Sequence, residues 1–322
     1  MSNYYIGVDG GGTKTEFIMA DSNGNIVANI IKEKSHYLMI GFNGLEKIIH
    51  EGVHSCIETA GCKQSDIVFC AVCICGYGDV KSHDCLIEEA IDHALVEIPH
   101  QVYSDTFNAH RGSLVGKSGI HVIAGTGSIA LGINDEGYSA RCGGWNHLFG
   151  GDEGSAYWLA CKMLLHFTRQ SDGREEKTAL YYYLKSKYQF NEDGDLIDYT
   201  VIDLEFDRTK IANMAKDLYE LAQSNDPVAI QIYSEAAQEL YDMVCAISNQ
   251  LVFTSPILVS YSGGVFKSGS FVLKPLEEKL NANGFKLEKP EFNPSIGSLI
   301  VAYTQSQTKL TDEMISKLRK YQ

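Results

Sequence analysis

The sequence predicts an α/β protein made of two related domains, and two observations carry that prediction. Glycine-rich turns at 9–14 and 125–128 each follow a short apolar run, and polar turns at 21–24 and 134–137 come about ten residues later. The order strand, glycine turn, strand, hairpin turn, strand therefore occurs twice. Outside these copies, apolar runs alternate with segments of helical spacing, as in a mixed sheet flanked by helices.

The two glycine-rich turns are candidate phosphate-binding sites. Glycine tolerates positive φ and lets backbone N–H groups approach a ligand, and successive N–H groups attract anions. A single such turn is more often a tight connection, and neither turn fits the dinucleotide or P-loop pattern. Because the turn is duplicated, we expect a nucleotide in a cleft between the domains. The expected phosphate contacts are Gly11, Gly12, Thr13, Thr126 and Gly127.

Length and charge restrict the class of protein. A chain of 322 residues suits two domains, and 44% hydrophobic with 21% charged residues is typical of a globular protein. The net charge of −14 argues against nucleic acid or an anionic membrane as a partner. No run approaches the ~20 apolar residues of a membrane helix. An anionic nucleotide must therefore be bound by local donors and a metal ion.

The nine cysteines favour a reducing compartment. Cys70, Cys73 and Cys75 lie in the apolar run 67–75, which is typical of a buried strand, where free cysteine packs as a small hydrophobe. The count is odd, and no signal peptide precedes Tyr4. We therefore expect a cytoplasmic protein.

The remaining elements follow from apolar spacing. The first domain is predicted to continue with a helix at 45–59, a strand at 67–75, a helix at 82–95, a strand at 101–105 and a helix at 109–114. After the second β unit, helices are predicted at 157–167, 181–190, 211–222 and 229–251, before a strand at 256–261. Two last helices, at 296–303 and 311–321, should pack on the first domain. The predicted domains are 1–115, completed by 296–322, and 116–295.

Three charged residues near the predicted strand ends are candidates for chemistry. Asp105 lies just past the strand residues 101–103 and is the candidate base for phosphoryl transfer to an alcohol; the alternative is an N-cap for a helix at 106–114. Asp9 beside the first turn would hold Mg²⁺ through water, unless it only forms the turn. Lys14 is either a phosphate contact or a solvated surface lysine.

The segment 143–155 is too polar and glycine-rich for a core element. It carries Trp145 and Asp152, and an indole with carboxylates in a flexible loop suits a polyhydroxylated ligand. The indole would stack on the apolar face of a sugar, and the carboxylate would accept hydrogen bonds from its hydroxyls. The alternative for Asp152 is an N-cap for a helix opening at Gly154.

With these motifs in order, the chain resembles the sugar kinase–Hsp70–actin superfamily. Within it, the chain is similar to the N-acetylglucosamine kinase branch of the BadF/BadG/BcrA/BcrD ATPase family. The motifs are 6–14, 104–105, 124–128, 143–158 and 262–267, which together span nearly the whole chain. The resemblance implies two ribonuclease-H-like (actin-like ATPase) domains with an interdomain cleft, which bind ATP, Mg²⁺ and a sugar.

The resemblance also implies roles for individual residues. It assigns Thr13 and the turn 125–128 to phosphates, and Ala212, Gly263, Gly264 and Lys267 to the adenosine. It assigns Gly76 in the loop 76–79, Asp105, Trp145 and Asp152 to the sugar, with His36, Ser128 and Gly144 as further candidate contacts. Asp105 would be the base.

The implied activity is transfer of the γ-phosphoryl group to the 6-hydroxyl of an amino sugar. N-acetylglucosamine is the first candidate, and N-acetylmuramic acid and glucosamine are alternatives. His36 stands where N-acetylglucosamine kinases carry an asparagine, and the double glycine Gly150-Gly151 lengthens the sugar loop by one residue. Both departures lie near the expected sugar pocket, so they leave the identity of the sugar open.

Two other functions are weighed against a kinase. ATPases of the same family activate acyl-CoA dehydratases through an iron–sulfur cluster, which needs a cysteine just before the second turn; this chain has no cysteine at 121–125. A regulator that uses ATP only to switch conformation has no need of a base such as Asp105. The expected partners are ATP and the sugar. A homodimer is possible, and the sequence leaves the oligomeric state open.

Overall fold

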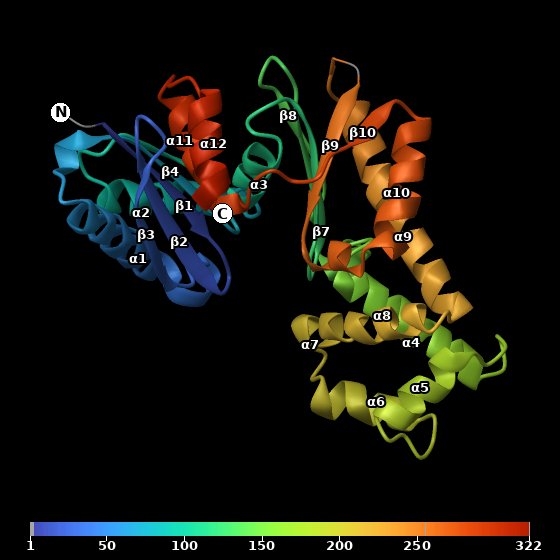
Figure 1. Cartoon of the computed structure of the whole chain (residues 1–322). Helices are drawn as coiled ribbons and strands as arrows, with labels where there is room; N and C mark the ends of the chain where they lie inside the picture. The colour runs from blue at the N-terminus through green and yellow to red at the C-terminus, as the bar shows by residue number, and fades with distance from the viewer. Residues whose placement is uncertain (1–2, 255, 322) are drawn as a thin grey trace. The chain divides into compact units, whose positions relative to one another are not determined.

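The computed structural model describes residues 3–254 and 256–321. The chain divides into two compact units, which are described separately (Figure 1). Unit 1 comprises Met1–Ser118 and Lys289–Gln322, and unit 2 comprises Gly119–Glu288. Unit 1 is thus completed by a segment that follows unit 2 in the sequence.

Unit 1 is built around a five-stranded mixed sheet with the order β3-β2-β1-β4-β5. Its strands are β1 (Tyr4–Gly10), β2 (Lys14–Asp21), β3 (Ile26–Glu33), β4 (Ile67–Ile74) and β5 (His100–Ser104). The first three are antiparallel hairpin partners, whereas β4 runs parallel to β1 and β5 runs parallel to β4. The carboxyl ends of β1, β4 and β5 therefore lie at one edge of the sheet.

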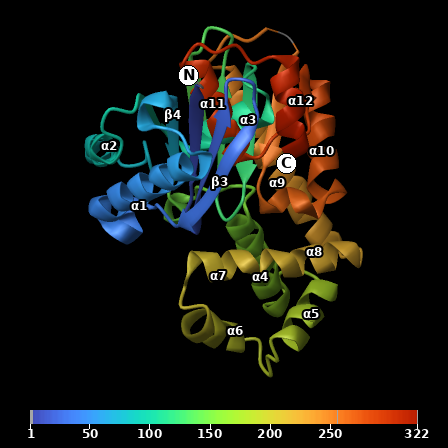
Figure 2. The same ribbon diagram turned by 60° about the vertical axis from the view of Figure 1, so that its left-hand side comes forward.

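Helices cover both faces of this sheet. On one face lie α1 (Tyr37–Ala60) and α2 (Lys81–Ala94), and on the other lie α3 (Asp105–Ser113), α11 (Pro294–Gln305) and α12 (Asp312–Tyr321), as Figures 1 and 2 show. A short 3₁₀ turn, Gln64–Asp66, precedes β4. Alternation along β1 explains the two layers, since Tyr5 joins the core under α11 and Ile6 joins the core under α1.

Helix α11 lies directly on β1 and α3. Its residues from Ser295 to Tyr303 are buried. A Cβ at Gly297 would overlap the carbonyl oxygen of Asn108, and a Cβ at Gly7 would overlap the backbone of Leu299. The two glycines thus permit backbone contacts that no larger residue allows.

Unit 2 repeats the topology of unit 1. Its sheet has the order β10-β9-β6-β7-β8 and consists of β6 (Gly119–Ala124), β7 (Ser128–Ile133), β8 (Ser139–Gly143), β9 (Ile257–Ser262) and β10 (Phe285–Leu287). Again three antiparallel strands come first, and the two later strands extend the sheet in parallel. The predicted duplication of the β unit and the predicted α/β class are confirmed.

The helices of unit 2 extend well beyond its sheet. They are α4 (Ala156–Ser171), α5 (Ala179–Lys187), α6 (Asp195–Asp198), α7 (Arg208–Asn213), α8 (Ala215–Gln223), α9 (Pro227–Ser248) and α10 (Ser270–Ala282), with 3₁₀ turns at His147–Phe149 and Gly264–Ser268 and a π-helix at Tyr199–Asp203. Helix α9 packs on α10 and on the sheet, and one hydrophobic core joins these layers. Asp226 caps α9 by accepting from the N–H groups of Val228 and Ala229.

Some elements differ from the sequence-based prediction. The expected helix at 211–222 is two helices, α7 and α8, which meet at Met214. Helix α1 begins at Tyr37 and not at residue 45. A short helical segment precedes the predicted helix, and a kink at Gly41 (φ 72°) separates the two. Neither α10 nor β10 was predicted. None of the helices that the structure describes has the length and apolar character needed to cross a membrane.

Replacement of Gly297 by alanine is expected to destabilise unit 1. The methyl group meets a backbone carbonyl that cannot rotate away, and such overpacking costs about 1–3 kcal/mol in the free energy of unfolding. Chemical denaturation measures the loss, with Gln305→Ala, at an exposed position of the same helix, as the matched control. Equal stability of the two variants would contradict the close approach of α11.

Candidate functional site

In unit 1, the polar groups gather where parallel strands end. Asp9 lies near the end of β1, the loop 76–79 follows β4, and Asp105 begins α3 directly after β5. The carboxylates are close enough to affect one another: burial chiefly, then the charges of Asp9 and Asp79, raise the pKa of Asp105 to about 6. The strand topology thus brings these predicted residues together.

Asp105 does not occupy the N-cap of α3. That position belongs to Ser104, which makes no side-chain cap hydrogen bond, and Asp105 is the first helical residue. Hydrogen bonds from the backbone N–H groups of Asp105 and Thr106 lower its pKa, but burial outweighs them. The N-cap alternative is therefore wrong, and the carboxyl group has the proton affinity expected of a base that works near neutral pH.

Asp9 is held in place by a neighbouring amide. Asn108 Nδ2 donates to Asp9 Oδ1 at 2.8 Å, yet burial raises the pKa of Asp9. Lys14, the candidate phosphate contact, instead forms an ion pair with Glu16 at 2.8 Å, with its side chain 56% exposed. Within the described residues no group of three or more metal-ligating side chains is found.

His36 and Gly76 lie side by side. His36 precedes α1, is half-buried, and its Nδ1 is buried without a hydrogen-bond partner among the described residues. Gly76 has φ 85°, and a Cβ there would lie 3.3 Å from His36 Cε1. The two candidate sugar contacts thus share one location, and His36 is not simply a surface residue.

The first glycine turn is a tight hairpin connection. Gly11, Gly12 and Thr13 join β1 to β2, and the Gly11 N–H donates to the Lys14 carbonyl at 2.9 Å. Neither Gly11 nor Gly12 has positive φ, nor does Gly127 of the second turn. The expectation of positive φ was wrong. A Cβ at Gly12 would meet open space, and a Cβ at Gly11 would lie 3.3 Å from the Lys14 carbonyl oxygen.

The second turn lies against the first residues of α4. The N–H groups of Ala156 and Tyr157 donate to the carbonyls of Gly125 (2.9 Å) and Thr126 (3.3 Å). At Gly127, a Cβ would overlap Arg208 Nη2 and Asp152 Oδ1. The turn is therefore enclosed by side chains as well as by a helix.

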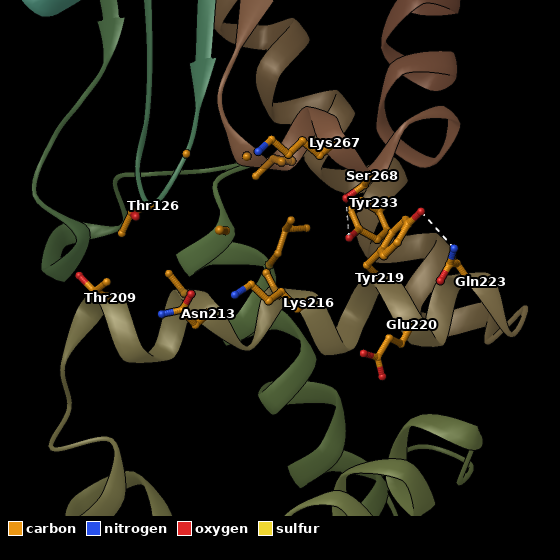
Figure 3. A pocket seen from close by; sticks show the side chains of 17 residues that line it. Thr126, Thr209, Asn213, Lys216, Tyr219, Glu220, Gln223, Tyr233, Lys267 and Ser268 are labelled. Atoms are coloured by element: carbon orange, nitrogen blue, oxygen red, sulfur yellow. Dashed lines mark hydrogen bonds between the residues drawn. The ribbon is translucent and has the colours of Figure 1, made fainter. Parts of the chain in front are cut away.

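A pocket of about 700 Å³ opens beside this turn, entirely within unit 2. Figure 3 shows Thr126 and Thr209 at one end and Tyr219 and Tyr233 at the other. Its wall includes three residues predicted to bind adenosine, Ala212, Gly264 and Lys267. Polar side chains are numerous in its lining, but its surface is mostly apolar, which is typical of a small-molecule site.

Gly263 has a structural part beside the pocket. Its φ is 108°, and a Cβ would overlap the carbonyl of Ala124 at the end of β6. The residue thus brings the Gly264–Ser268 turn close to the phosphate turn. It is not among the residues that line the pocket.

The segment 143–155 is partly exposed and partly fixed. Gly144, with φ 69°, lies beside Ser128, and its N–H donates to the Ser128 carbonyl at 2.9 Å. Trp145 is 71% exposed, and the Arg141 guanidinium lies 5.8 Å from its ring centroid. The residue that caps α4 is Ser155, so the N-cap alternative for Asp152 is wrong.

Asp152 is buried and fully engaged, unlike the flexible loop carboxylate that we expected. Its Oδ1 accepts from the Ser128 N–H at 3.2 Å, and its Oδ2 pairs with Arg208. Ser128 is also buried, and its hydroxyl donates to the Glu153 carbonyl at 2.7 Å. A sugar contact by either side chain requires these bonds to rearrange. Arg208 itself was missed, because no motif marks it and only the fold brings it to the turn.

Comparisons with known proteins agree with this architecture. The sequence profile of the BadF/BadG/BcrA/BcrD ATPase family matches residues 6–302. The chain is 29% identical over 312 residues to an N-acetyl-D-glucosamine kinase of Dictyostelium discoideum, covering 92% of this chain and 97% of that protein. It is 28% identical over 306 residues to an N-acetylmuramic acid/N-acetylglucosamine kinase of Clostridium acetobutylicum, covering 94% and 99%.

A solved structure extends the comparison to the fold. It comes from Chromobacterium violaceum and is described as a candidate N-acetylglucosamine kinase. The TM-score is 0.72 at 21% identity, over 93% of this chain and 99% of that one. The predicted sugar-kinase (actin-like ATPase) fold is confirmed.

Replacement of Asp105 by asparagine is expected to stabilise the protein at neutral pH. The folded state holds the Asp105 proton more tightly than the unfolded state, whose pKa is near 3.8. The penalty for ionising the buried carboxylate therefore grows as pH rises from about 4 to about 6, and it reaches its full value above pH 6. Asp105→Asn should gain about 1–3 kcal/mol in the free energy of unfolding at pH 7.5 and less at pH 4.5.

Denaturant unfolding at the two pH values measures this gain. Glu89→Gln, at an exposed position of α2, is the control and should show no such dependence. A less stable Asp105→Asn variant at pH 7.5 would contradict the proposed environment of the carboxylate.

Proposed function

The chain belongs to the BadF/BadG/BcrA/BcrD ATPase family, and we propose that it is an ATP-dependent kinase of an amino sugar. The reaction transfers the γ-phosphoryl group of ATP to the sugar 6-hydroxyl. The observation that carries the proposal is the pair of features on the two units: a base of raised pKa on unit 1, and an apolar pocket beside a phosphate turn on unit 2.

Asp105 acts as the base in this proposal. The sugar oxygen bonds to the γ-phosphorus, the bond from that phosphorus to the β–γ bridging oxygen breaks, and the hydroxyl proton passes to Asp105. Phosphoryl transfer needs mainly alignment and electrostatic stabilisation, so one carboxylate suffices. With its pKa at about 6, Asp105 is ionised at pH 7 and still basic enough to accept the proton.

The nucleotide occupies the pocket of unit 2. Its adenosine lies between α7, α8 and the Gly264–Ser268 turn, and its phosphates reach Thr126. Gly11, Gly12 and Thr13 of the first turn supply further phosphate donors. The net charge of −14 means that these local groups must overcome a repulsive overall field.

Mg²⁺ is proposed as the metal, held by Asp9 through water. The charge of Asp9 raises the pKa of Asp105, so an anionic site exists that a cation would stabilise. Mg²⁺ keeps several waters and binds through one or two carboxylates and substrate phosphates, which fits a site with a single protein ligand. When bound, it would neutralise phosphate charge.

N-acetylglucosamine is the proposed sugar, because the two curated relatives reported above both carry that name. The second of them is also named for N-acetylmuramic acid, and glucosamine remains a further alternative. Gly76, His36, Gly144 and Trp145 are the proposed contacts, with Ser128 and Asp152 after rearrangement. A cytoplasmic location and a homodimer also stay proposals; all nine cysteines are free, which suits a reducing compartment.

ADP release in a coupled assay tests the function. The protein should turn over ATP and Mg²⁺ only when an N-acetyl hexosamine is present, and Asp105→Asn should lower kcat by about 10²–10⁴-fold with nucleotide binding retained. Glucosamine and glucose complete the panel. Sugar-independent turnover would favour the ATPase activator, and nucleotide binding without turnover would favour the regulator.

Replacement of His36 by asparagine tests the choice of sugar. A histidine can donate to the lactyl carboxylate of N-acetylmuramic acid, so kcat/KM for that sugar should fall about tenfold relative to N-acetylglucosamine. His54→Asn, an exposed histidine of α1, is the control. An unchanged ratio would place His36 outside the pocket.

A further inference from the structure

Arg208 lies at the phosphate end of the nucleotide pocket. The pocket ends at Thr126 and Thr209 (Figure 3). Gly127 follows Thr126 in the sequence, and Arg208 precedes Thr209. A Cβ on Gly127 would overlap Arg208 Nη2. The guanidinium therefore lies against the turn itself, just beyond the wall of the pocket.

Most hydrogen-bonding capacity of Arg208 is unused. A guanidinium carries five N–H donors, and among the described residues Arg208 uses one nitrogen, Nη2, in a hydrogen bond to Asp152. Its Nε is buried without a partner among the described residues, although the side chain as a whole is 37% exposed. Buried donors nearly always have an acceptor, which indicates that an acceptor from a ligand belongs here.

Asp152 orients the guanidinium instead of leaving it mobile. Its side chain is 4% exposed, and its other oxygen is fixed by the Ser128 N–H. The chain of bonds from Ser128 through Asp152 to Arg208 ties the guanidinium to the turn that is expected to hold phosphate. Such preorganisation lowers the entropy lost when a ligand binds.

The position distinguishes Arg208 from the lysines of the pocket. Lys216 and Lys267 line the pocket along its length (Figure 3). Arg208 lies beyond the Thr126 end, where the phosphate furthest from the adenosine should be. A planar guanidinium can bind two phosphate oxygens at once, which an ammonium cannot do with fixed geometry.

We propose that Arg208 binds the terminal phosphoryl group of the nucleotide and stabilises it during transfer. The proposal rests on the function proposed above. The guanidinium donates to phosphate oxygens from Nε and from the Nη protons that its bond to Asp152 leaves free, and it takes up no proton and forms no covalent bond. Charge that spreads over the transferred oxygens is thereby offset by a fixed cation.

Nucleotide binding by calorimetry separates this role from others. A non-hydrolysable ATP analogue, ADP and AMP are titrated into the wild type and into Arg208→Gln, Arg208→Lys and Lys210→Gln. Lys210→Gln is the matched control, because it also removes one cation from α7. The Lys210 side chain pairs with Glu205, away from the turn. Thermal unfolding verifies that each variant is folded, and Arg208→Lys keeps the charge if Arg208→Gln is unstable.

The expected pattern is specific to the terminal phosphate. Arg208→Gln should lower the affinity for the ATP analogue by roughly 10–100-fold, as expected for the loss of a charged hydrogen bond. Its affinity for AMP should stay within about twofold of the wild-type value. Its kcat with sugar should fall by about 10²–10⁴-fold, with partial recovery in Arg208→Lys. Lys210→Gln should match the wild type.

Two outcomes would overturn the proposal. Equal weakening of AMP and the ATP analogue would mean that Arg208 supports the adenosine wall. Unchanged binding of the ATP analogue together with a raised KM for the sugar would mean that Arg208 acts only through Asp152. In that case Asp152→Asn would show the same raised KM. The binding arm needs no sugar, so a wild type that binds the analogue but phosphorylates no sugar would reject the proposed function and not this one.

Discussion

The parallel pairing of β1 with β4, and of β4 with β5, is the constraint on which the candidate site of unit 1 depends. Backbone hydrogen bonds fix Val8 opposite Val72 and Val72 opposite Val102. Asp9, the loop 76–79 and Asp105 come from segments far apart in the sequence, yet Asp9 lies at the end of β1 and the other two follow β4 and β5. The same burial that secures the strands raises the pKa of Asp105. Stability and reactivity at this edge are therefore opposed.

Unit 2 shows how a repeated topology acquires a different task. Both units begin with three antiparallel strands and extend them with two parallel ones. In unit 1 the insertions are short, and helices lie on the sheet. In unit 2 the chain from α4 to α9 forms a helical region whose members α4, α7 and α8 enclose the pocket beside the turn. The β unit supplies the phosphate turn, and the added helices supply the apolar wall.

The sequence predicted what local patterns encode. Apolar runs and helical spacing located most strands and helices, and Asp105 was found because it follows a predicted strand. The break at Met214 was not predictable, since 211–222 keeps its apolar spacing across it. Nor were the bonds of Asp152: a glycine-rich loop suggested mobility, whereas Ser128 and Arg208, distant in sequence, fix the carboxylate. Contacts of this kind depend on tertiary structure and leave no spacing to read.

The return of the chain to unit 1 has a consequence for synthesis. Unit 2 is one continuous segment, Gly119–Glu288, whereas unit 1 needs Lys289–Gln322 to cover one face of its sheet. During translation, the apolar face formed by Tyr5, Ile18 and Ala71 stays without α11 until unit 2 has been made. The usual order, in which the N-terminal domain folds first, is thus reversed. A released chain truncated before residue 289 should expose that face to chaperones, while its second half, which holds all of unit 2, is protease-resistant.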